Sequence, residues 1–233
     1  MVDHAQVNNT VAALRADVQR LHAELAMVTS DHKHREREMQ RQLRNILSVI
    51  RSIVHRTGAE ADSIESYEML LDGRISAFAR VQSLLLFDPV SGVDLFSMFA
   101  DEALAAGLRD DAILYEGNSV YISAQAANTL ALIAHELMLA AAGHDLSESV
   151  GTLVHLHQQI EPSAGVNSAA LIIDWKQYWT DEDSQSSAFG WLAEALSYDV
   201  HGEIQTFPWA HGTCRRFIMP IETALAPASL SSA

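Results

Sequence analysis

The first 57 residues contain neither glycine nor proline, and their apolar residues recur at alternating steps of four and three. In residues 7–28 these positions are Val7, Val11, Leu14, Val18, Leu21, Leu25 and Val28. This spacing places them on one stripe of an α-helix and is typical of a coiled-coil seam. We expect the stripe to pair with a second copy of the chain; the alternative is a single amphipathic helix packed on its own domain.

A second stripe continues the pattern and predicts a helical hairpin. Residues 39, 43, 46, 50 and 53 are apolar at helical spacing, and residues 72–85 repeat this with Ile75, Phe78 and Leu85. We expect the first helix to run to about residue 56 and Gly58 to occupy its C-terminal cap position. Two hairpins form a four-helix bundle, so the sequence predicts a coiled-coil helix over residues 1–35 and a dimerisation hairpin over residues 36–88.

The hairpin residues also resemble a known family. Residues 40–47 read Gln-Arg-Gln-Leu-Arg-Asn-Ile-Leu, and Gly73, Arg74, Ile75, Ala77, Phe78, Arg80, Leu84 and Leu85 follow in the second helix. This frame is similar to the phosphoacceptor hairpin of the HWE-type sensor histidine kinases of bacteria, whose first helix reads Gln-His-Arg-Val-Lys-Asn-x-Leu. The resemblance implies two-component signalling, but the family's phosphorylated histidine falls on Arg41.

The remainder of the chain predicts an α+β domain over residues 89–222, beginning at the turn residues Pro89 and Gly92. Its periodicities predict helices over residues 93–106, 124–142 and 188–200, and strands over residues 112–115, 119–122, 151–157, 169–175 and 215–220. Helices on one face of a mixed sheet form a two-layer sandwich. The small and polar residues 223–233 predict a disordered tail.

This second domain resembles the ATP-binding domain of the same family, so the resemblance covers about residues 36–221. His135, Glu136 and Leu137 match the family's His-Glu-Leu-x-x-Asn-Ala box, and Trp175 matches its Trp-x-Glu box. Tyr198, Gly202 and Glu203 match the segment after the last helix. The resemblance therefore implies a histidine-kinase-type ATPase α/β sandwich.

Several departures from the family pattern predict that this nucleotide site is degenerate. Ala140 stands where the family's asparagine holds magnesium, and a methyl group offers no oxygen to a hard cation. Gln177 replaces the glutamate of Trp-x-Glu, and Tyr178-Trp179 replaces a Gly-Gly pair that lets backbone approach phosphate. The acidic cluster Asp181-Glu182-Asp183 follows and would repel a triphosphate. We therefore expect no nucleotide and no other cofactor at His135, Glu136, Ala140, Trp175 and Gln177.

Basic residues gather in the first hairpin helix although the chain has a net charge of −15. Arg37, Arg41, Arg44 and Arg51 form this cluster. In the resembled family the hairpin is where the acidic receiver domain of a response regulator docks, which suits such a cluster. The alternative is a solvated helix face. The acidic balance of the whole chain argues against nucleic acid as a partner.

Three histidines outside the box carry weaker hypotheses. His55 lies two heptads after Arg41 and could accept a phosphoryl group, or it could simply be an exposed side chain. His155 and His157 lie two apart on a predicted strand and share a face, but no third ligand is visible in the sequence. We therefore predict no metal site.

Targeting and redox features place the chain in the cytoplasm. Its one cysteine, Cys214, excludes an intramolecular disulfide, and no signal peptide is visible. The longest apolar run, residues 126–134, is too short to span a bilayer. The sequence thus predicts a dimeric pseudo-histidine kinase that docks a receiver domain; the alternatives are a phosphotransferase that uses His55 and an active kinase with an unusual site.

Overall fold

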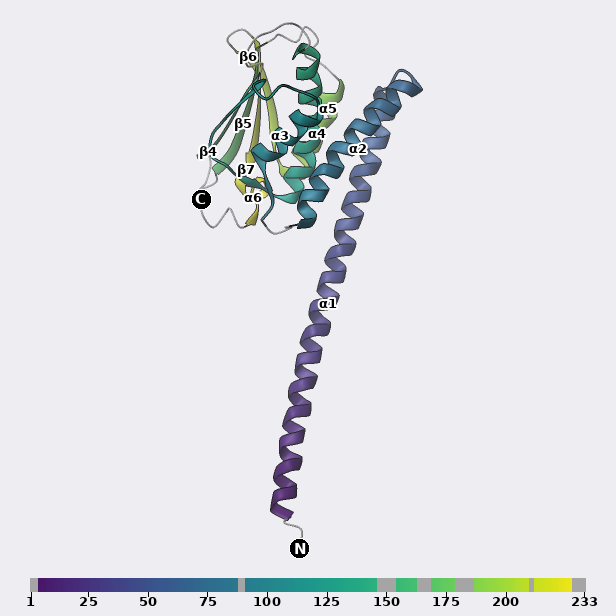
Figure 1. Ribbon diagram of the computed structural model, residues 1–233, viewed down its shortest axis with the longest axis vertical. Helices are drawn as coiled ribbons and strands as arrows, with labels where there is room; N and C mark the ends of the chain where they lie inside the picture. The colour runs from purple at the N-terminus through teal and green to yellow at the C-terminus, as the bar shows by residue number, and fades with distance from the viewer. Residues whose placement is uncertain are drawn as a thin grey trace. The chain divides into compact units, whose positions relative to one another are not determined.

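A computed structural model describes residues 4–87, 91–145, 154–162, 169–178, 187–209 and 212–227. The chain divides into two compact units, Met1–Ser52 and Ile53–Ala233. The first helix, α1 (His4–Glu60), begins in the first unit and ends in the second (Figure 1). The division falls inside α1 and not at residues 88–89, because the second hairpin helix packs against the central helix of the sandwich.

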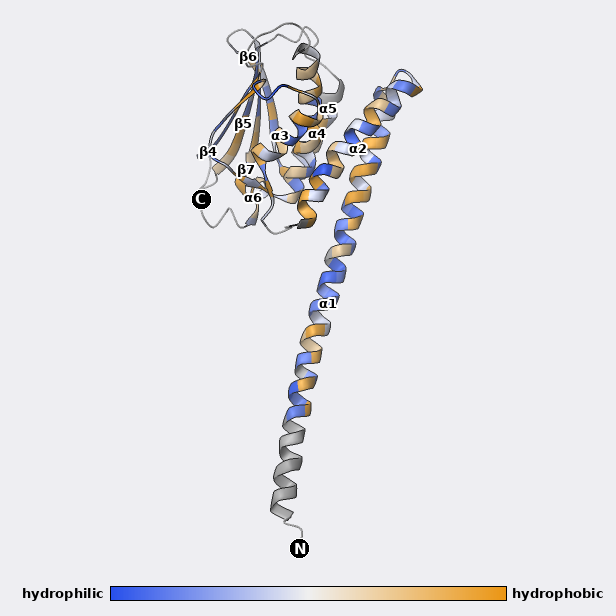
Figure 2. Cartoon of the chain, viewed as in Figure 1, coloured by the Kyte–Doolittle hydropathy of each residue, from blue (hydrophilic) through white to orange (hydrophobic). Residues whose placement is uncertain are grey.

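The first unit consists of α1 alone, which confirms the predicted long helix. Val18, Leu21, Leu25 and Val28 are each between 50% and 67% exposed along it. Met39 and Leu43 continue the pattern and are also more than half exposed. Figure 2 shows orange, hydrophobic segments recurring along the coloured part of α1. Among the residues described in this unit nothing covers the stripe, and its pairing with a second chain stays a prediction.

The end of α1 differs from the prediction that Gly58 caps it. The helix continues through Gly58 to Glu60, and the Ala61 amide donates to the Thr57 carbonyl at 3.0 Å. The second hairpin helix, α2 (Ile64–Phe87), follows after a short connection, and the Ser63 hydroxyl accepts from the Ser66 amide at 3.0 Å at its start. Buried contacts of the Thr57 and Glu60 side chains explain the extra turn of α1.

The second unit contains a five-stranded sheet in the order β2-β4-β5-β7-β6 (Figure 1). The strands are β2 (Ile113–Glu116), β4 (Val154–Pro162), β5 (Ala169–Gln177), β6 (Glu203–Trp209) and β7 (Gly212–Pro220). The edge strand β2 pairs in parallel with β4, and the other pairs are antiparallel. A two-stranded sheet joins β1 (Val93–Asp94) to β3 (Tyr121–Ile122). The predicted α+β class with a mixed sheet is confirmed.

Helices cover one face of this sheet. They are α3 (Leu95–Ala105), α4 (Ala124–Asp145), α5 (Ser187–Val200) and the short α6 (Ile221–Ala224). Asp94 caps α3 by accepting from the Ser97 amide at 2.8 Å, and Ser123 begins α4 by accepting from the Ala126 amide. Among the described helices one, at Ala124–Gly143, is long and apolar enough to cross a membrane, but most of it is buried as the core helix of the sandwich.

Alternation along the strands separates the two faces of the sheet. On β4, Val154, Leu156 and Gln158 are buried, whereas His155 and His157 on the opposite face are partly exposed. On β5, Trp175 packs 6.4 Å from the ring of Phe99 in α3, so it belongs to the helix-facing side. The hydrophobic core therefore lies between the helices and one face of the sheet. The opposite face carries polar side chains such as His155 and His157.

Two features of this unit differ from expectation. The edge strand β6 was not predicted, because Pro208 interrupts its pattern and only edge strands tolerate proline. The expectation of a disordered tail from residue 223 is wrong as far as Ala226, since Ala224, Leu225 and Ala226 are buried and Leu225 bridges Ile122. Residues 228–233 lie outside the described part of the chain.

Candidate functional site

A buried arginine on α2 fixes the glutamate of the His-Glu box. Arg74 is only 1% exposed and donates to Glu136 Oε1 of α4 at 2.7 Å and to Glu60 Oε2 of α1 at 2.6 Å. It also donates to the Thr57 hydroxyl at 3.0 Å, and its guanidinium lies 5.5 Å from the ring centre of Trp191. Four helices thus meet at one side chain.

The electrostatics of this cluster keep it charged. Burial alone would lower the pKa of Arg74, but its hydrogen bonds and charge pairing with Glu136 and Glu60 outweigh burial and raise it. A buried cation paired with two carboxylates is strongly coupled, since removing one partner leaves an uncompensated charge. Glu136 therefore has a structural role as the partner of Arg74 and is oriented toward the hairpin.

The neighbouring histidine of the box is paired as well. His135 Nδ1 lies 2.8 Å from Glu102 Oε1 of α3, and Arg80 of α2 donates two hydrogen bonds from Nη2 and one from Nε to the same carboxylate. Burial would raise the pKa of Glu102, but the hydrogen bonds from His135 and Arg80 lower it below its ordinary value. The other ring nitrogen of His135 faces Gly73, where an added Cβ would lie only 2.6 Å from Nε2. Glycine is required there for α2 to approach α4.

The residues of the Trp-x-Glu counterpart lie in the sheet core. Trp175 is fully buried, and its Nε1 donates to Gln177 Oε1 at 3.3 Å. Arg215 of β7 also donates to Gln177 Oε1. At the position of the glutamate of Trp-x-Glu, the Gln177 side chain is thus a neutral hydrogen-bond acceptor inside the core.

The other predicted positions of the nucleotide site are more scattered. Ala140 lies on α4, five residues after His135, and is exposed. Tyr198 is exposed on α5, whereas Gly202 is packed so tightly that an added Cβ would lie 2.8 Å from Met219 Cγ. Trp179 and the acidic cluster Asp181-Glu182-Asp183 lie outside the described residues.

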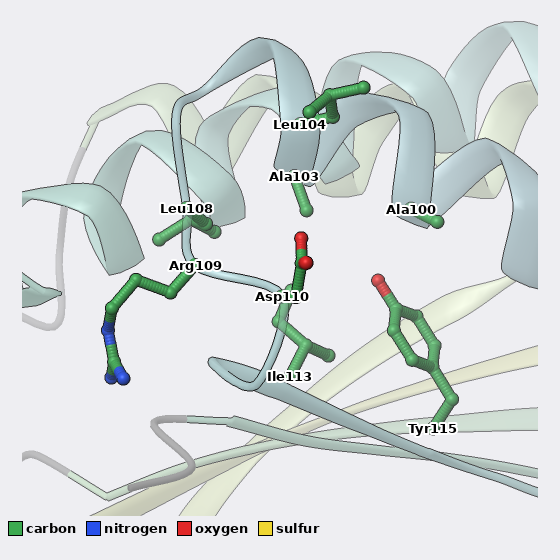
Figure 3. A pocket seen from close by; sticks show the side chains of 8 residues that line it. All are labelled: Ala100, Ala103, Leu104, Leu108, Arg109, Asp110, Ile113 and Tyr115. Carbon is green, nitrogen blue, oxygen red and sulfur yellow. The ribbon is translucent and has the colours of Figure 1, made fainter. Parts of the chain in front are cut away.

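A hollow of about 140 Å³ lies apart from the predicted nucleotide-site residues. Residues of α3, the loop after it and β2 line it, including Leu104, Asp110 and Tyr115 (Figure 3). Burial raises the pKa of Tyr115 to about 12, so the phenol stays protonated at neutral pH. Ligand pockets usually measure about 300–1,000 Å³, and none of His135, Glu136, Ala140, Trp175 or Gln177 lines this hollow.

The basic cluster of the first helix forms a stripe in the structure. Arg37, Arg41, Arg44 and Arg51 follow one another in α1 at steps of four, three and seven and are all exposed. His55, four residues beyond Arg51 in the same helix, is exposed as well. We call these four arginines the basic stripe. They contrast with Arg74 and Arg80, which sequence reasoning used only to match a motif and which the structure assigns to the pairs with Glu136 and Glu102.

A helical hairpin followed by a sandwich with a His-Glu box on its central helix is the architecture of a histidine-kinase-type protein. Residues 38–119 match the family model of the HWE histidine kinases. This match supports a histidine-kinase-like protein of two-component signalling. No curated protein sequence matches the chain.

Solved structures share the fold. The histidine kinase domain from the Erythrobacter litoralis EL346 blue-light activated histidine kinase superimposes with a TM-score of 0.50 at 16% identity, over 76% of this chain and 84% of that one. A longer structure of the same kinase gives a TM-score of 0.52 at 12% identity, over 77% of this chain and 59% of that one. At these identities the likeness concerns the fold alone.

Proposed function

We propose that this protein acts in two-component signalling without binding ATP or phosphorylating itself, and that it docks the receiver domain of a response regulator as a dimer. The observation that carries the proposal is Arg41, which stands at the family's phosphoacceptor position within the exposed basic stripe. We place the protein in the cytoplasm, with no nucleic-acid or membrane partner.

The chemistry of the Arg41 side chain suits binding of a carboxylate and not transfer of a phosphoryl group. A guanidinium stays protonated and cannot take the place of an imidazole as phosphoacceptor, but its planar donors pair with a carboxylate. Receiver domains present an acidic phosphorylation pocket to this part of the hairpin in the resembled family. Four arginines on a chain with a net charge of −15 therefore support a docking surface for an acidic partner.

The absence of ATP chemistry rests on the His-Glu box. Glu136 is paired with a buried arginine and His135 with a buried glutamate, so both side chains hold helices together. Ala140 offers no oxygen to magnesium, and Gln177 is a buried acceptor of the core. Each of these features supports a structural use of residues that the family uses for nucleotide.

Dimerisation is supported by the apolar stripes of α1. Leu21, Leu25 and Val28 are each more than half exposed, at the spacing of a coiled-coil seam. Exposed apolar patches of this kind mark interaction surfaces, and a second copy of the same helix offers the matching pattern.

The docking proposal is tested by measuring receiver binding to Arg41→Ala and Arg41→His, using a panel of receiver domains from the source cell. Arg41→Ala should weaken binding by about 1–3 kcal/mol if the arginine pairs with a carboxylate in the complex. Arg35→Ala is the matched control, because it removes the same charge from the opposite face of α1. Equal losses for the two variants, or none for either, would contradict the docking surface.

Arg41→His tests the geometry of the same complex. If docking places the receiver's aspartate against residue 41, the new imidazole should accept phosphate from a phosphorylated receiver. A wild-type protein that already accepts phosphate would instead favour the phosphotransferase alternative. The exposure of His55 on the same helix supports that alternative, and loss of labelling in His55→Gln would establish it.

A further inference from the structure

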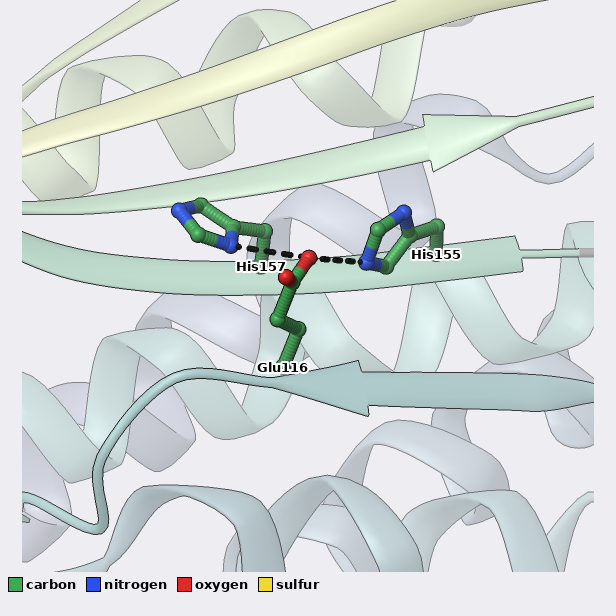
Figure 4. Close-up of side chains that lie close together, drawn as sticks. All are labelled: Glu116, His155 and His157. Carbon is green, nitrogen blue, oxygen red and sulfur yellow. Dashed lines mark ion pairs between the residues drawn. The ribbon is translucent and has the colours of Figure 1, made fainter.

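Three ligand-type side chains converge on the open face of the sheet. Glu116 is the last residue of the edge strand β2, and His155 and His157 lie on the neighbouring strand β4. The parallel register sets Glu116 opposite His157 and Leu114 opposite His155. The side chains of Glu116, His155 and His157 therefore share the sheet face away from the helices (Figure 4). This face carries none of the residues of the His-Glu box.

The ligand atoms are close enough to hold one ion. His155 Nε2 lies 2.7 Å from Glu116 Oε2, and His157 Nδ1 lies 3.2 Å from the same oxygen. All three ligand atoms fall within 4.8 Å of one another. Both ring nitrogens are shielded from solvent, and each pairs with the Glu116 carboxylate, as the dashed lines in Figure 4 mark. Two imidazole nitrogens therefore converge on a single carboxylate oxygen, as the ligands of one ion would.

The hydrogen bonds beside His157 indicate which of its nitrogens carries the lone pair when the ring is neutral. The amide nitrogen of Gln159 donates to Glu161 Oε1 at 2.6 Å, which leaves Gln159 Oε1 as the atom 3.3 Å from His157 Nε2. Nε2 of His157 must then donate its hydrogen to that oxygen. In the neutral ring Nδ1 carries the lone pair and faces the carboxylate of Glu116. Either a proton on Nδ1 or a metal ion can lie between this nitrogen and the carboxylate, and a metal ion can be shared with His155 as well.

We propose that Glu116, His155 and His157 bind a divalent transition-metal ion of the zinc class. Bonds of about 2.0–2.2 Å in a tetrahedral arrangement separate ligand atoms by roughly 3.3 Å. The distance of 3.2 Å between His157 and Glu116 already fits this value. The shorter distance to His155 must open by about half an ångström, which the Glu116 side chain, 58% exposed, can accommodate.

The donor set selects the kind of metal. Imidazole nitrogens suit zinc, copper and nickel, whereas magnesium and calcium prefer sites made of oxygen. The hydrogen bonds from His157 through Gln159 to Glu161 are the kind of outer contacts that orient a metal-binding histidine. Three protein ligands leave a fourth position for water or for another ligand.

The backbone places the carboxylate in position before any ion arrives. Gly117 follows Glu116 with φ of +122°, and an added Cβ would lie 2.2 Å from the Gln158 carbonyl oxygen. Only glycine allows β2 to end this close to β4. A bound ion would therefore join the edge strand β2 to β4 and stabilise the folded sheet.

Cobalt and zinc titrations of the chelator-treated full chain test the site. We expect one Co²⁺ per chain, with the visible absorption of tetrahedral coordination, and displacement of that signal by Zn²⁺ but not by Mg²⁺. His155→Gln and His157→Gln should each abolish the absorption. Gln159→Ala should weaken binding about 10–100-fold, because it removes only the orienting contact. His22→Gln, which changes an exposed histidine of α1, is the control and should leave the signal unchanged.

Equal binding by wild type, His155→Gln and His157→Gln would overturn the proposal, as would the lack of a saturable signal in wild type. If the histidine variants do not fold, Glu116→Gln decides the question, because that side chain is largely exposed and we expect its replacement to preserve the fold. Retention of the full cobalt signal by Glu116→Gln would also overturn the site.

Discussion

At the scale of single residues, Arg74 joins the hairpin to the sandwich through a buried ion-pair cluster. Its guanidinium donates at once to Thr57 and Glu60 at the end of α1 and to Glu136 of α4. The sequence marks this arginine only as part of a Gly-Arg-Ile motif. Its partners could not be predicted, because they are 14, 17 and 62 residues away along the chain.

Arg74→Ala should destabilise the second unit by about 3–5 kcal/mol, because it leaves two carboxylates buried without a counter-charge. Urea unfolding followed by circular dichroism measures this change. Arg56→Ala is the matched control: its partner Glu194 is 70% exposed, so this loss should stay within about 1 kcal/mol. Similar losses for both variants would contradict a special role for Arg74.

The pairing of Glu102 predicts a pH dependence of stability. Burial acts to raise its pKa, but the hydrogen bonds from His135 and Arg80 lower it below the ordinary 4.5. A carboxyl whose pKa is lower in the folded state stabilises above its unfolded pKa, and this contribution is lost as pH falls through the folded pKa. Stability should therefore decline below about pH 4.5.

Unfolding free energies of wild type and Glu102→Gln measured between pH 7 and pH 3 check this dependence. The variant should be less stable at neutral pH, and the difference between the two proteins should shrink as the solution becomes acidic. A difference that stays constant across the range would show that Glu102 does not contribute through its charge.

At the scale of secondary-structure elements, sequence periodicity predicted the helices. It missed an edge strand and a side-chain neighbour that depend on which strands pair. The stripes of α1 and the apolar character of α4 follow from helical spacing, and both helices were predicted. The strand β6 was missed because it is an exposed edge with Pro208 inside it. The third side chain beside His155 and His157 was missed because Glu116 reaches them only through the parallel pairing of β2 with β4.

The exposed apolar stripe of α1 predicts a dimer, and charged residues introduced into this stripe should disrupt it. Leu21→Glu combined with Val28→Glu places two carboxylates in the seam, and light scattering should then report the 25.6 kDa monomer where wild type gives twice that mass. Gln19→Glu combined with Ala26→Glu adds the same charge on another face of α1 and should leave the dimer intact. A wild-type monomer at micromolar concentration would refute the seam.

At the scale of the whole molecule, the second hairpin helix belongs to the same compact unit as the sandwich. Arg74, Arg80 and Gln82 of α2 each reach across to α4 or α3, through Glu136, Glu102 and Asn128 respectively. Arg74 contacts Glu136 of the His-Glu box directly, and Arg80 shares Glu102 with His135, so the box helps to attach α2. The same residues therefore explain both the cohesion of this unit and the proposed loss of ATP chemistry.

Titration with Mg-ATP by calorimetry tests that loss, with an active kinase domain of the family as the positive control. Wild type should show no saturable binding, and a dissociation constant in the low micromolar range would contradict the proposal. The sharper variant is Ala140→Asn, which returns an amide oxygen to the magnesium position. It should still fail to bind, because Glu136 remains paired with Arg74 and His135 with Glu102. If Ala140→Asn binds Mg-ATP, the missing magnesium ligand alone accounts for the loss, and the paired box residues remain compatible with nucleotide.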